Sequence, residues 1–213
     1  TVGLHLPRAA MTTHILSKST YIRGLQCPKA LYLYKNRRDL MPPIDLAQQA
    51  IFDAGTQVGI LAQQLFPGGV ELKPETAFDF GPSIAATRAA IDRGERVIYE
   101  AAFIHEDVMA ALDILVRTDE GWKAYEVKSS GGVQDYHIQD AALQAHVIES
   151  NGVALVDVSI IHMNMAYVRQ GPVDVHGLFK ITSVRDKVAV ERAQVPARIA
   201  DLKAMLATGE EPD

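Results

Sequence analysis

The hydrophobic period of the chain changes near residue 97, and this change constrains the fold more than any other feature of the sequence. Before it, apolar residues recur at helical spacing; after it, they form the short runs typical of strands. The first part is therefore predicted to be helical. Its helices are expected to start at Ser17 and at Pro28, and to cover Asp45–Leu65 and Ser83–Arg93.

The second part of the chain alternates strands with a long helix. Strands are predicted over Val97–Ile104, Val108–Arg117 and Trp122–Lys128, then a helix over Tyr136–Ser150 and a buried strand over Ala154–His162. Peripheral strands over Met165–Arg169 and Val173–Ile181 and a terminal helix over Val195–Ala207 complete the pattern. This order predicts an α/β fold in which a mixed central sheet is flanked by helices.

Two of the predicted helices carry more detailed signals. One face of the Asp45–Leu65 helix is expected to be buried, because its apolar residues lie at helical spacing: Ile51, Ala54, Val58, Leu61, Ala62 and Leu65. Ser83 is the expected N-cap of the next helix, and Gly94 is expected to end it.

The length of 213 residues indicates one compact domain. Within it we expect a helical region over 11–95, packed on a core over 96–213 that ends in peripheral strands and the terminal helix. Residues 1–10 precede Met11 and are interpreted as a tag or an upstream leader, with Met11 as the natural start.

Charge and cysteine content exclude several classes of protein. The single Cys27 rules out an internal disulfide framework and a metal site built only from cysteines of this chain. The formal net charge of −5 argues against nucleic-acid binding by bulk charge, although a local basic patch stays open. No apolar run reaches ~18 residues, so no membrane span is predicted. With no secretory signal and one free thiol, the expected compartment is the cytoplasm.

The residues that suggest chemistry lie between 97 and 149. Asp113 stands in the apolar run ALDILV, where a carboxylate is unusual without a partner. Glu126 and Lys128 follow in the next strand and, two positions apart, point to the same face. A tight turn between the strands would bring Asp113 to that face, so two carboxylates and a lysine are expected to converge.

This set suits metal-assisted hydrolysis of a phosphodiester. Carboxylate oxygens of Asp113 and Glu126, with the carbonyl of Val127, are ligands suited to Mg²⁺ or Mn²⁺. Lys128 would orient the attacking water or neutralise developing charge. The alternative stays open that Glu126 and Lys128 form a solvated strand face and that Asp113 is a salt-bridged core carboxylate.

Two further polar groupings accompany this set. His137, Asp140 and Gln144 share one arc of the following helix, and the Asp140–Gln144 side is expected to face the carboxylates. Basic and aromatic residues near the second helix would suit stacking and tracking of a single strand, or would form a solvated helix end: Lys35, Arg37, Arg38, Tyr32 and Tyr34.

With these residues in place, the sequence resembles the PD-(D/E)XK nuclease superfamily, which has the restriction-endonuclease-like fold. Within it, the chain is similar to RecB-type nuclease domains, to CRISPR-associated exonucleases with an iron–sulfur cluster, and to a related bacterial family of uncharacterised domains. The matching stretches span most of 16–182: Leu16–Lys29 (LSKSTYIRGLQCPK), Gly55–Gly59 (GTQVG) through Leu65–Gly69 (LFPGG), Leu112–Leu115 (LDIL), Tyr125–Ser130 (YEVKSS) and His137–Gln144 (HIQDAALQ).

The resemblance implies roles for individual residues. Asp113 and Glu126 would be metal ligands, Glu100 a secondary ligand, and Lys128 the catalytic lysine. The arc with Asp140 and Gln144 would stand in for the glutamine–tyrosine helix motif of RecB-type nucleases, with Gln144 in place of the tyrosine.

Two more departures accompany the resemblance. Gly59 stands where RecB-type enzymes often have a metal-binding histidine. Cys27 matches the first of four cluster cysteines, but the other three are absent, so no iron–sulfur cluster is expected and a plain buried thiol is the preferred interpretation. Either the cluster is not used, or the chain is a fragment and a further domain or a partner protein follows residue 213.

The sequence thus predicts a Mg²⁺- or Mn²⁺-dependent nuclease that acts on DNA, at ends or on single strands. One rival is a catalytically degenerate nuclease fold that serves nucleic-acid binding or assembly. The other is an unrelated α/β domain in which Asp113 and Glu126 are structural.

Overall fold

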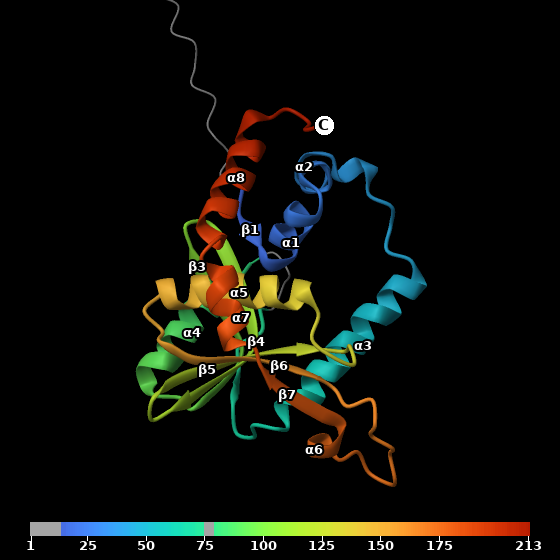
Figure 1. The fold of residues 1–213 in the computed structure, drawn as a ribbon, viewed down its shortest axis with the longest axis vertical. Helices are drawn as coiled ribbons and strands as arrows, with labels where there is room; N and C mark the ends of the chain where they lie inside the picture. The colour runs from blue at the N-terminus through green and yellow to red at the C-terminus, as the bar shows by residue number, and fades with distance from the viewer. Residues whose placement is uncertain (1–13, 75–78) are drawn as a thin grey trace, which may run out of the picture.

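The computed structural model describes residues 14–74 and 79–213, so the expected leader over 1–10 lies outside the described residues. The fold is α/β, as predicted, with an open, mixed seven-stranded sheet (Figure 1). Six strands follow the order β2-β3-β4-β5-β6-β7, and β1 pairs with β4. The strands are β1 (Leu16–Ser17), β2 (Val70–Glu71), β3 (Val97–His105), β4 (Val108–Thr118), β5 (Gly121–Lys128), β6 (Leu155–Met163) and β7 (Phe179–Ser183).

Helices flank this sheet. They are α1 (Lys18–Gln26), α2 (Pro28–Asn36), α3 (Leu46–Gln63), α4 (Gly81–Arg93), α5 (Asp135–Ser150), α6 (Val175–Leu178), α7 (Arg185–Arg192) and α8 (Val195–Thr208), with a 3₁₀ turn at Arg38–Leu40. Ser17 caps α1 by accepting from the Thr20 N–H, and Pro28 opens α2 as predicted. Gly94 ends α4 in the left-handed region, with φ 83°.

The predicted cap of α4 is wrong. The N-cap is Phe80, and Ser83 lies inside the first turn, where its side chain is buried. Pro82 occupies one of the first two helical positions, which need no intrahelical N–H bond. The proline therefore moves the helix start upstream of the serine.

The peripheral strands are only partly as predicted. Met165–Arg169 is not a strand, and Val173–Ile181 divides into α6 and the start of β7. Gly171 has φ 82°, and Pro172 lacks the N–H that a sheet ladder requires. Asp174 then caps α6 by accepting from the His176 N–H. These turn residues override the apolar alternation. Helix α7 was not among the predicted elements.

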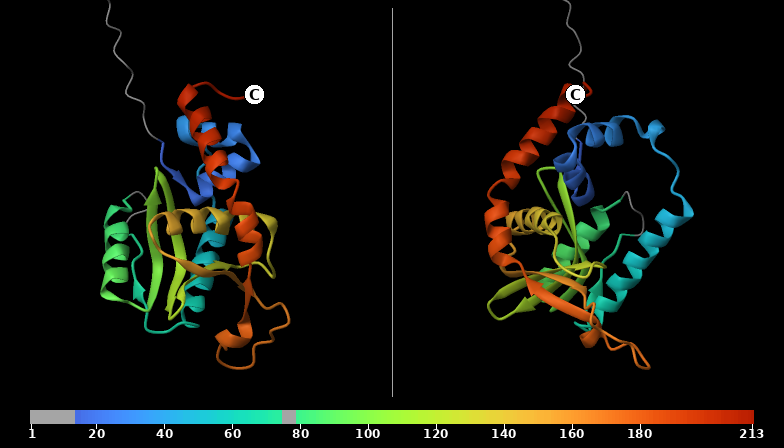
Figure 2. Two further views of the ribbon diagram at one scale, coloured as in Figure 1. Left: turned by 60° about the vertical axis from the view of Figure 1, so that its left-hand side comes forward. Right: turned by 45° about the vertical axis from the view of Figure 1, so that its right-hand side comes forward.

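Helix α3 buries only its second half. Val58, Leu61, Ala62 and Leu65 pack with Tyr99, Ile114, Tyr125, Ile161 and Phe179 in an apolar cluster on the sheet. Ile51 and Ala54, predicted on the same buried face, are exposed, Ile51 by 64%. The right-hand view of Figure 2 shows why: α3 runs away from the sheet towards the segment that links it to α2.

A larger apolar cluster holds the other helices on the sheet. Helix α5 crosses the strands at the front in Figure 1, with α7 and α8 beside it. Leu143 and Ile148 of α5, Tyr21 of α1 and Leu202 of α8 meet strand residues such as Leu112 in this cluster. The packing of α1 against α5 brings the N-terminal helices next to the end of β5.

The N-terminal region is more than a helical layer, because β1 and β2 belong to the sheet. Strand β1 pairs with β4 in parallel, Leu16 opposite Val108, and β2 pairs with β3 in parallel, Val70 opposite Ile98. Within 14–74 and 79–213, no helix is both long and apolar enough to cross a membrane.

Candidate active site

The site forms where the edge of β4 divides between two strands. Strand β3 pairs along one edge of β4, so β1 and β5 share the other edge. β1 pairs with the start of β4 at Val108 and Met109, and β5 pairs from Ile114 onward. Asp113 is the last residue before the β5 pairing begins. It therefore lies at a fork in the sheet, where its carboxylate can accept a hydrogen bond from a backbone N–H that the β4–β5 ladder does not use.

Three acidic residues lie in register across this fork. Because Tyr99 pairs with Ile114 and Ala101 with Leu112, Glu100 is opposite Asp113. On the other edge, Ile114 pairs with Tyr125, so the next step along the strands sets Asp113 beside Glu126. The predicted convergence of Asp113 and Glu126 thus follows from the strand register.

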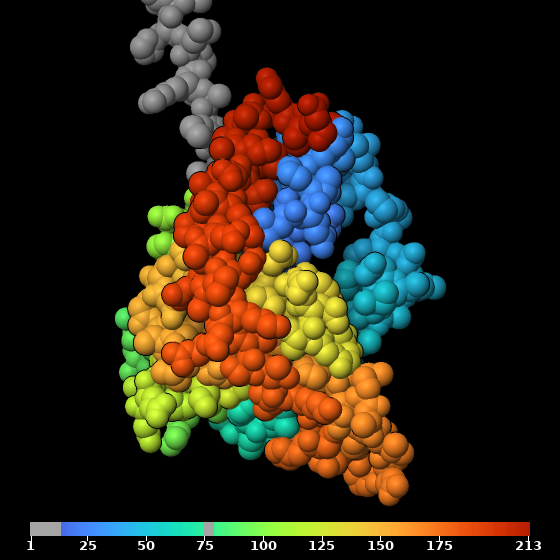
Figure 3. Space-filling model, viewed as in Figure 1, coloured from blue at the N-terminus to red at the C-terminus, as the bar shows by residue number. Residues whose placement is uncertain are grey.

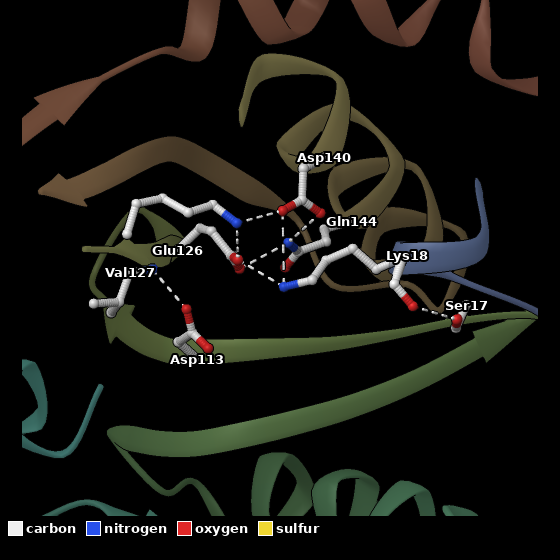
Figure 4. A network of polar contacts seen from close by, with 9 residues as sticks. Ser17, Lys18, Asp113, Glu126, Val127, Asp140 and Gln144 are labelled. Atoms are coloured by element: carbon white, nitrogen blue, oxygen red, sulfur yellow. Dashed lines mark hydrogen bonds and ion pairs between the residues drawn. The ribbon is translucent and has the colours of Figure 1, made fainter. Parts of the chain in front are cut away.

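Glu126 is the centre of the polar network in Figure 4. It is buried, and its Oε1 accepts from Lys18 Nζ at 2.6 Å and from Lys128 Nζ at 2.7 Å. The contact with Lys128 confirms that these two side chains of β5 share a face. The contact with Lys18 brings the first residue of α1 to the same oxygen.

Helix α5 supplies the rest of the network, from the side we predicted. Asp140 Oδ2 accepts from Lys128 Nζ at 2.6 Å, and Gln144 Nε2 donates to Glu126 Oε2 at 2.8 Å and to Asp140 Oδ1 at 3.2 Å. Asp140 and Gln144 are both buried. The Gln144 Oε1 atom is buried, and no group of the described residues donates to it, so one acceptor at the site stays available.

Asp113 is held by the backbone of Val127 on the neighbouring strand β5. The backbone N–H of Val127 donates to Asp113 Oδ2 at 2.6 Å (Figure 4). The role of the Val127 carbonyl oxygen as a metal ligand stays a prediction. A strand N–H that has lost its ladder partner at the fork is satisfied in this way.

Burial and charge set the protonation of the two central carboxylates. Burial, followed by repulsion from Glu126, raises the pKa of Asp113 to about 8. Burial also opposes ionisation of Glu126, but the ammonium groups of Lys18 and Lys128 together hold its pKa well below the usual range. Glu126 is therefore an anion at neutral pH, whereas Asp113 retains much of its proton when no further cation is near.

Lys18 and Lys128 in turn stay charged because of the acidic groups beside them. Burial alone would lower the pKa of Lys18 and Lys128, but attraction to Glu126 and then to Asp140 outweighs it and raises both. Burial raises the pKa of Asp140.

Glu100 shows two further signs of constraint. Burial, and next the charge of Glu71, raises the pKa of its carboxyl group. Its backbone has φ 54°, in the left-handed region that a glutamate rarely adopts. Such a conformation costs about 1–3 kcal/mol and is held in place by the surrounding structure.

The remaining predicted residues have other surroundings. His137 is buried, and its Nδ1 accepts from the Gln134 N–H at 3.1 Å. Burial lowers the pKa of His137 to about 4, so its ring is neutral. Gly59 lies in the second half of α3, and a Cβ added there would meet no atom of the described residues within 4 Å.

The preference for a buried thiol at Cys27 is wrong, because Cys27 is exposed. It stands between α1 and α2 with extended backbone, and its Sγ accepts from the Ala30 N–H at 3.4 Å. The need for a cap in front of Pro28 places the thiol at the surface instead of in the core.

Lys18 is a residue of the polar network that the sequence did not reveal. Its segment signals a helix start, and nothing in that signal links it to a strand more than a hundred residues later. The only available hint was the match of Leu16–Lys29 as a block, which did not single out the lysine.

In the part of the chain that the structure describes, no three Asp, Glu, His or Cys side chains are already grouped around one metal position. A scan against protein-family models and a search of curated proteins find no match to the chain.

Proposed function

We propose that this chain is a metal-dependent nuclease that hydrolyses phosphodiester bonds of DNA, in single strands or at ends. The observation that carries the proposal is the meeting of Asp113, Glu126 and Lys128 at the fork of β4, with Glu126 and Lys128 held by α5. The resemblance to PD-(D/E)XK nucleases assigns the same three residues to catalysis.

The donor set fits a divalent cation. When all four are ionised, Glu100, Asp113, Glu126 and Asp140 carry four negative charges against the two positive charges of Lys18 and Lys128, which leaves −4 + 2 = −2 for a cation to offset. Burial, and next repulsion from Glu126, raises the pKa of Asp113, and a bound cation would relieve that repulsion. Asp113 and Glu126 would hold Mg²⁺ or Mn²⁺, with Glu100 and the Val127 carbonyl as further oxygen donors.

The metal, when bound, polarises the phosphate and lowers the pKa of water. Lys128 keeps its proton and presents an ammonium group to the water or to the negative charge that develops on the phosphate. Asp140 orients Lys128, and Gln144 orients Glu126 by donating a hydrogen bond to Glu126 Oε2. The free Gln144 Oε1 is an acceptor for the proton of a water near Glu126.

A second function is favoured by two observations. Gly59 offers no ligand, and the ammonium groups of Lys18 and Lys128 already neutralise Glu126. These suit a catalytically degenerate module that binds nucleic acid or assembles with other proteins. In either function, the single thiol favours a cytoplasmic setting.

Cleavage assays separate the two functions. The full chain is incubated with labelled single-stranded and duplex DNA in Mg²⁺ or Mn²⁺, beside Lys128→Met and Asp113→Asn. Lys123→Met is the matched control, because Lys123 is at the other end of β5. The nuclease proposal expects cleavage by the wild type and the control, and a loss of at least about 10²-fold in the two site variants. A wild-type chain that cuts neither substrate supports the degenerate module.

A further inference from the structure

The surface of α1 and α2 carries an unusual group of cations around one tyrosine. The guanidinium carbons of Arg23 and Arg38 both lie 4.8 Å from the centroid of the Tyr34 ring. Lys35 is adjacent, and burial together with the nearby charge of Arg38 lowers its pKa. These four residues are called the Tyr34 cluster below.

The cations of the Tyr34 cluster have no acidic partners in the part of the chain described. Neighbouring Arg37 pairs with Asp39 at 2.8 Å, whereas no ion pair joins Arg23, Lys35 or Arg38 to a carboxylate within 14–74 and 79–213. Three like charges held together in a protein of net charge −5 repel one another. An anion bound among them would relieve that repulsion, and this points to a ligand with negative charge.

A cleft connects this cluster to the candidate active site. It has a volume of about 420 Å³, and Lys18, Lys128 and Asp140 line it at the site end, while Arg23 lines it towards Tyr34. Figure 3 shows the hollow between the blue surface of α1 and the yellow surface at the start of α5. Arg23 thus belongs both to the cleft and to the Tyr34 cluster, so the two form one continuous surface.

An exposed aromatic ring stands on the opposite wall of the cleft. Tyr136, the second residue of α5, is 48% exposed, and its ring meets the edge of the buried His137 ring at 4.3 Å between centroids. Aromatic rings beside a cationic groove are how proteins stack the bases of single strands while cations follow the phosphates. This arrangement favours a single strand, whose bases are free to stack, over a duplex.

We propose that the cleft and the Tyr34 cluster form the track that binds a single strand of nucleic acid, with phosphates on Arg23 and Arg38 and a base on Tyr136. The proposal rests on the proposed function for the position of the reacting phosphate and adds the path of the strand away from it. Lys35 adds a third positive charge beside Arg38, with its ammonium group donating to the Ile15 carbonyl oxygen.

Binding without cleavage tests the track. Fluorescence anisotropy of a short fluorescein-labelled oligothymidylate is measured in EDTA over a series of salt concentrations. The variant Arg23→Gln/Arg38→Gln is expected to bind about tenfold more weakly, and the slope of log K against log salt to fall by about 1.4, since each phosphate contact on a single strand contributes about 0.7. Arg117→Gln is the matched control, because Arg117 lies 5.6 Å over the Trp122 ring at the far end of β4. It is expected to leave binding unchanged.

A second variant tests the proposed contact between a base and the Tyr136 ring. Tyr136→Leu keeps an apolar side chain on α5 but removes the ring, and it is expected to weaken binding at least about fivefold with the salt slope unchanged. Thermal melts of all variants verify that they are folded, which exposed side chains at these positions allow.

The outcomes keep the track and the nuclease proposal apart. If wild type cleaves with Mn²⁺ but Arg23→Gln/Arg38→Gln binds as wild type does, the track is wrong and the nuclease stands. If the oligonucleotide binds with the expected losses in the variants but no cleavage occurs, the track stands and the nuclease proposal fails. An oligonucleotide that does not bind wild type at low salt overturns the track outright.

Discussion

Lys18 Nζ donates a hydrogen bond of 2.6 Å to Glu126 Oε1 across a sequence separation of 108 residues. The contact joins the first residue of α1 to the centre of the site on β5. It places the Lys18 ammonium group on the same oxygen that receives Lys128. The N-terminal helices are thereby part of the site, and the charge balance of Glu126 depends on them.

Replacing Lys18 with methionine tests this coupling. Without metal, Lys18→Met leaves buried Glu126 and Asp140 with one ammonium group, so the free energy of unfolding is expected to fall by about 2 kcal/mol. Mn²⁺ is expected to restore more stability in Lys18→Met than in wild type, because the cation no longer competes with the lysine. Melting curves in EDTA and in Mn²⁺ measure both effects. Lys29→Met, which breaks an exposed pair with Glu211, is the control and should change little. Equal stability of Lys18→Met and wild type in EDTA would contradict the coupling.

The pH dependence of stability should carry the signature of Asp113. Its folded-state pKa is about 8, above the value of about 4 expected in the unfolded chain. The folded state therefore holds this proton more tightly, so the contribution is fully present below about pH 4 and is lost as the pH rises towards 8. In EDTA, Asp113→Asn is expected to remove this loss and to melt a few degrees higher than wild type near pH 8. Asp92→Asn on α4 is the control. Parallel pH profiles for Asp113→Asn and wild type would refute the assignment.

The ionisation of Glu126 should change the stability with pH in the opposite direction to Asp113. Lys18 and Lys128 outweigh burial and hold the pKa of Glu126 below the value of the unfolded chain. Its contribution is present above about pH 4.3 and is lost as the pH falls through the folded pKa. Glu126→Gln is expected to cost about 3 kcal/mol near neutral pH, because it leaves two ammonium groups with Asp140 alone, and to cost less in acid. Urea titrations at two pH values measure the difference. A penalty that does not shrink on acidification would show that the charge of Glu126 is not what stabilises the network.

Much of the site was predictable because it lies within one supersecondary unit. The strand periods of β4 and β5 fix which faces their residues share, and a short turn fixes their register, so Asp113, Glu126 and Lys128 were expected together. The helical spacing of Asp140 and Gln144 added the next layer. These contacts depend on local periodicity, and a single sequence contains that information.

The rest depended on contacts between distant segments. Nothing local in the chain reveals that Lys18 reaches β5, or that the ladder of β4 divides at Asp113. The exposed half of α3 is a similar case, since Ile51 has the spacing of a buried residue but is exposed, and the first half of α3 runs beyond the sheet (Figure 2). At Cys27 and Pro172, local backbone requirements overrode a hydrophobic interpretation.

Metal binding should be visible as stabilisation, independent of any cleavage. A cation that binds the folded site at about a hundred times its Kd adds about 2.7 kcal/mol, which raises the Tm of a chain of this size by roughly 5–11 °C. This rise is expected for wild type in Mn²⁺, to be reversed by EDTA, and to be absent in Asp113→Asn. Asp92→Asn, far from the site on α4, should retain it. An equal rise in Asp113→Asn would place the metal elsewhere.

Two glycines in helices make a matched test of the packing that carries Lys18 to the site. A Cβ at Gly24 of α1 would lie 2.8 Å from Leu202 Cδ1 and 2.9 Å from Leu31 Cδ2, both buried, whereas a Cβ at Gly59 of α3 would meet nothing. Gly24→Ala is expected to destabilise the chain by about 1–3 kcal/mol through overpacking. It is also expected to weaken the ion pair between Lys18 and Glu126. Gly59→Ala should instead gain about 0.5–1 kcal/mol from helix propensity. Urea denaturation measures both, and a shift of the two variants in the same direction would mean that α1 is not packed closely against α8.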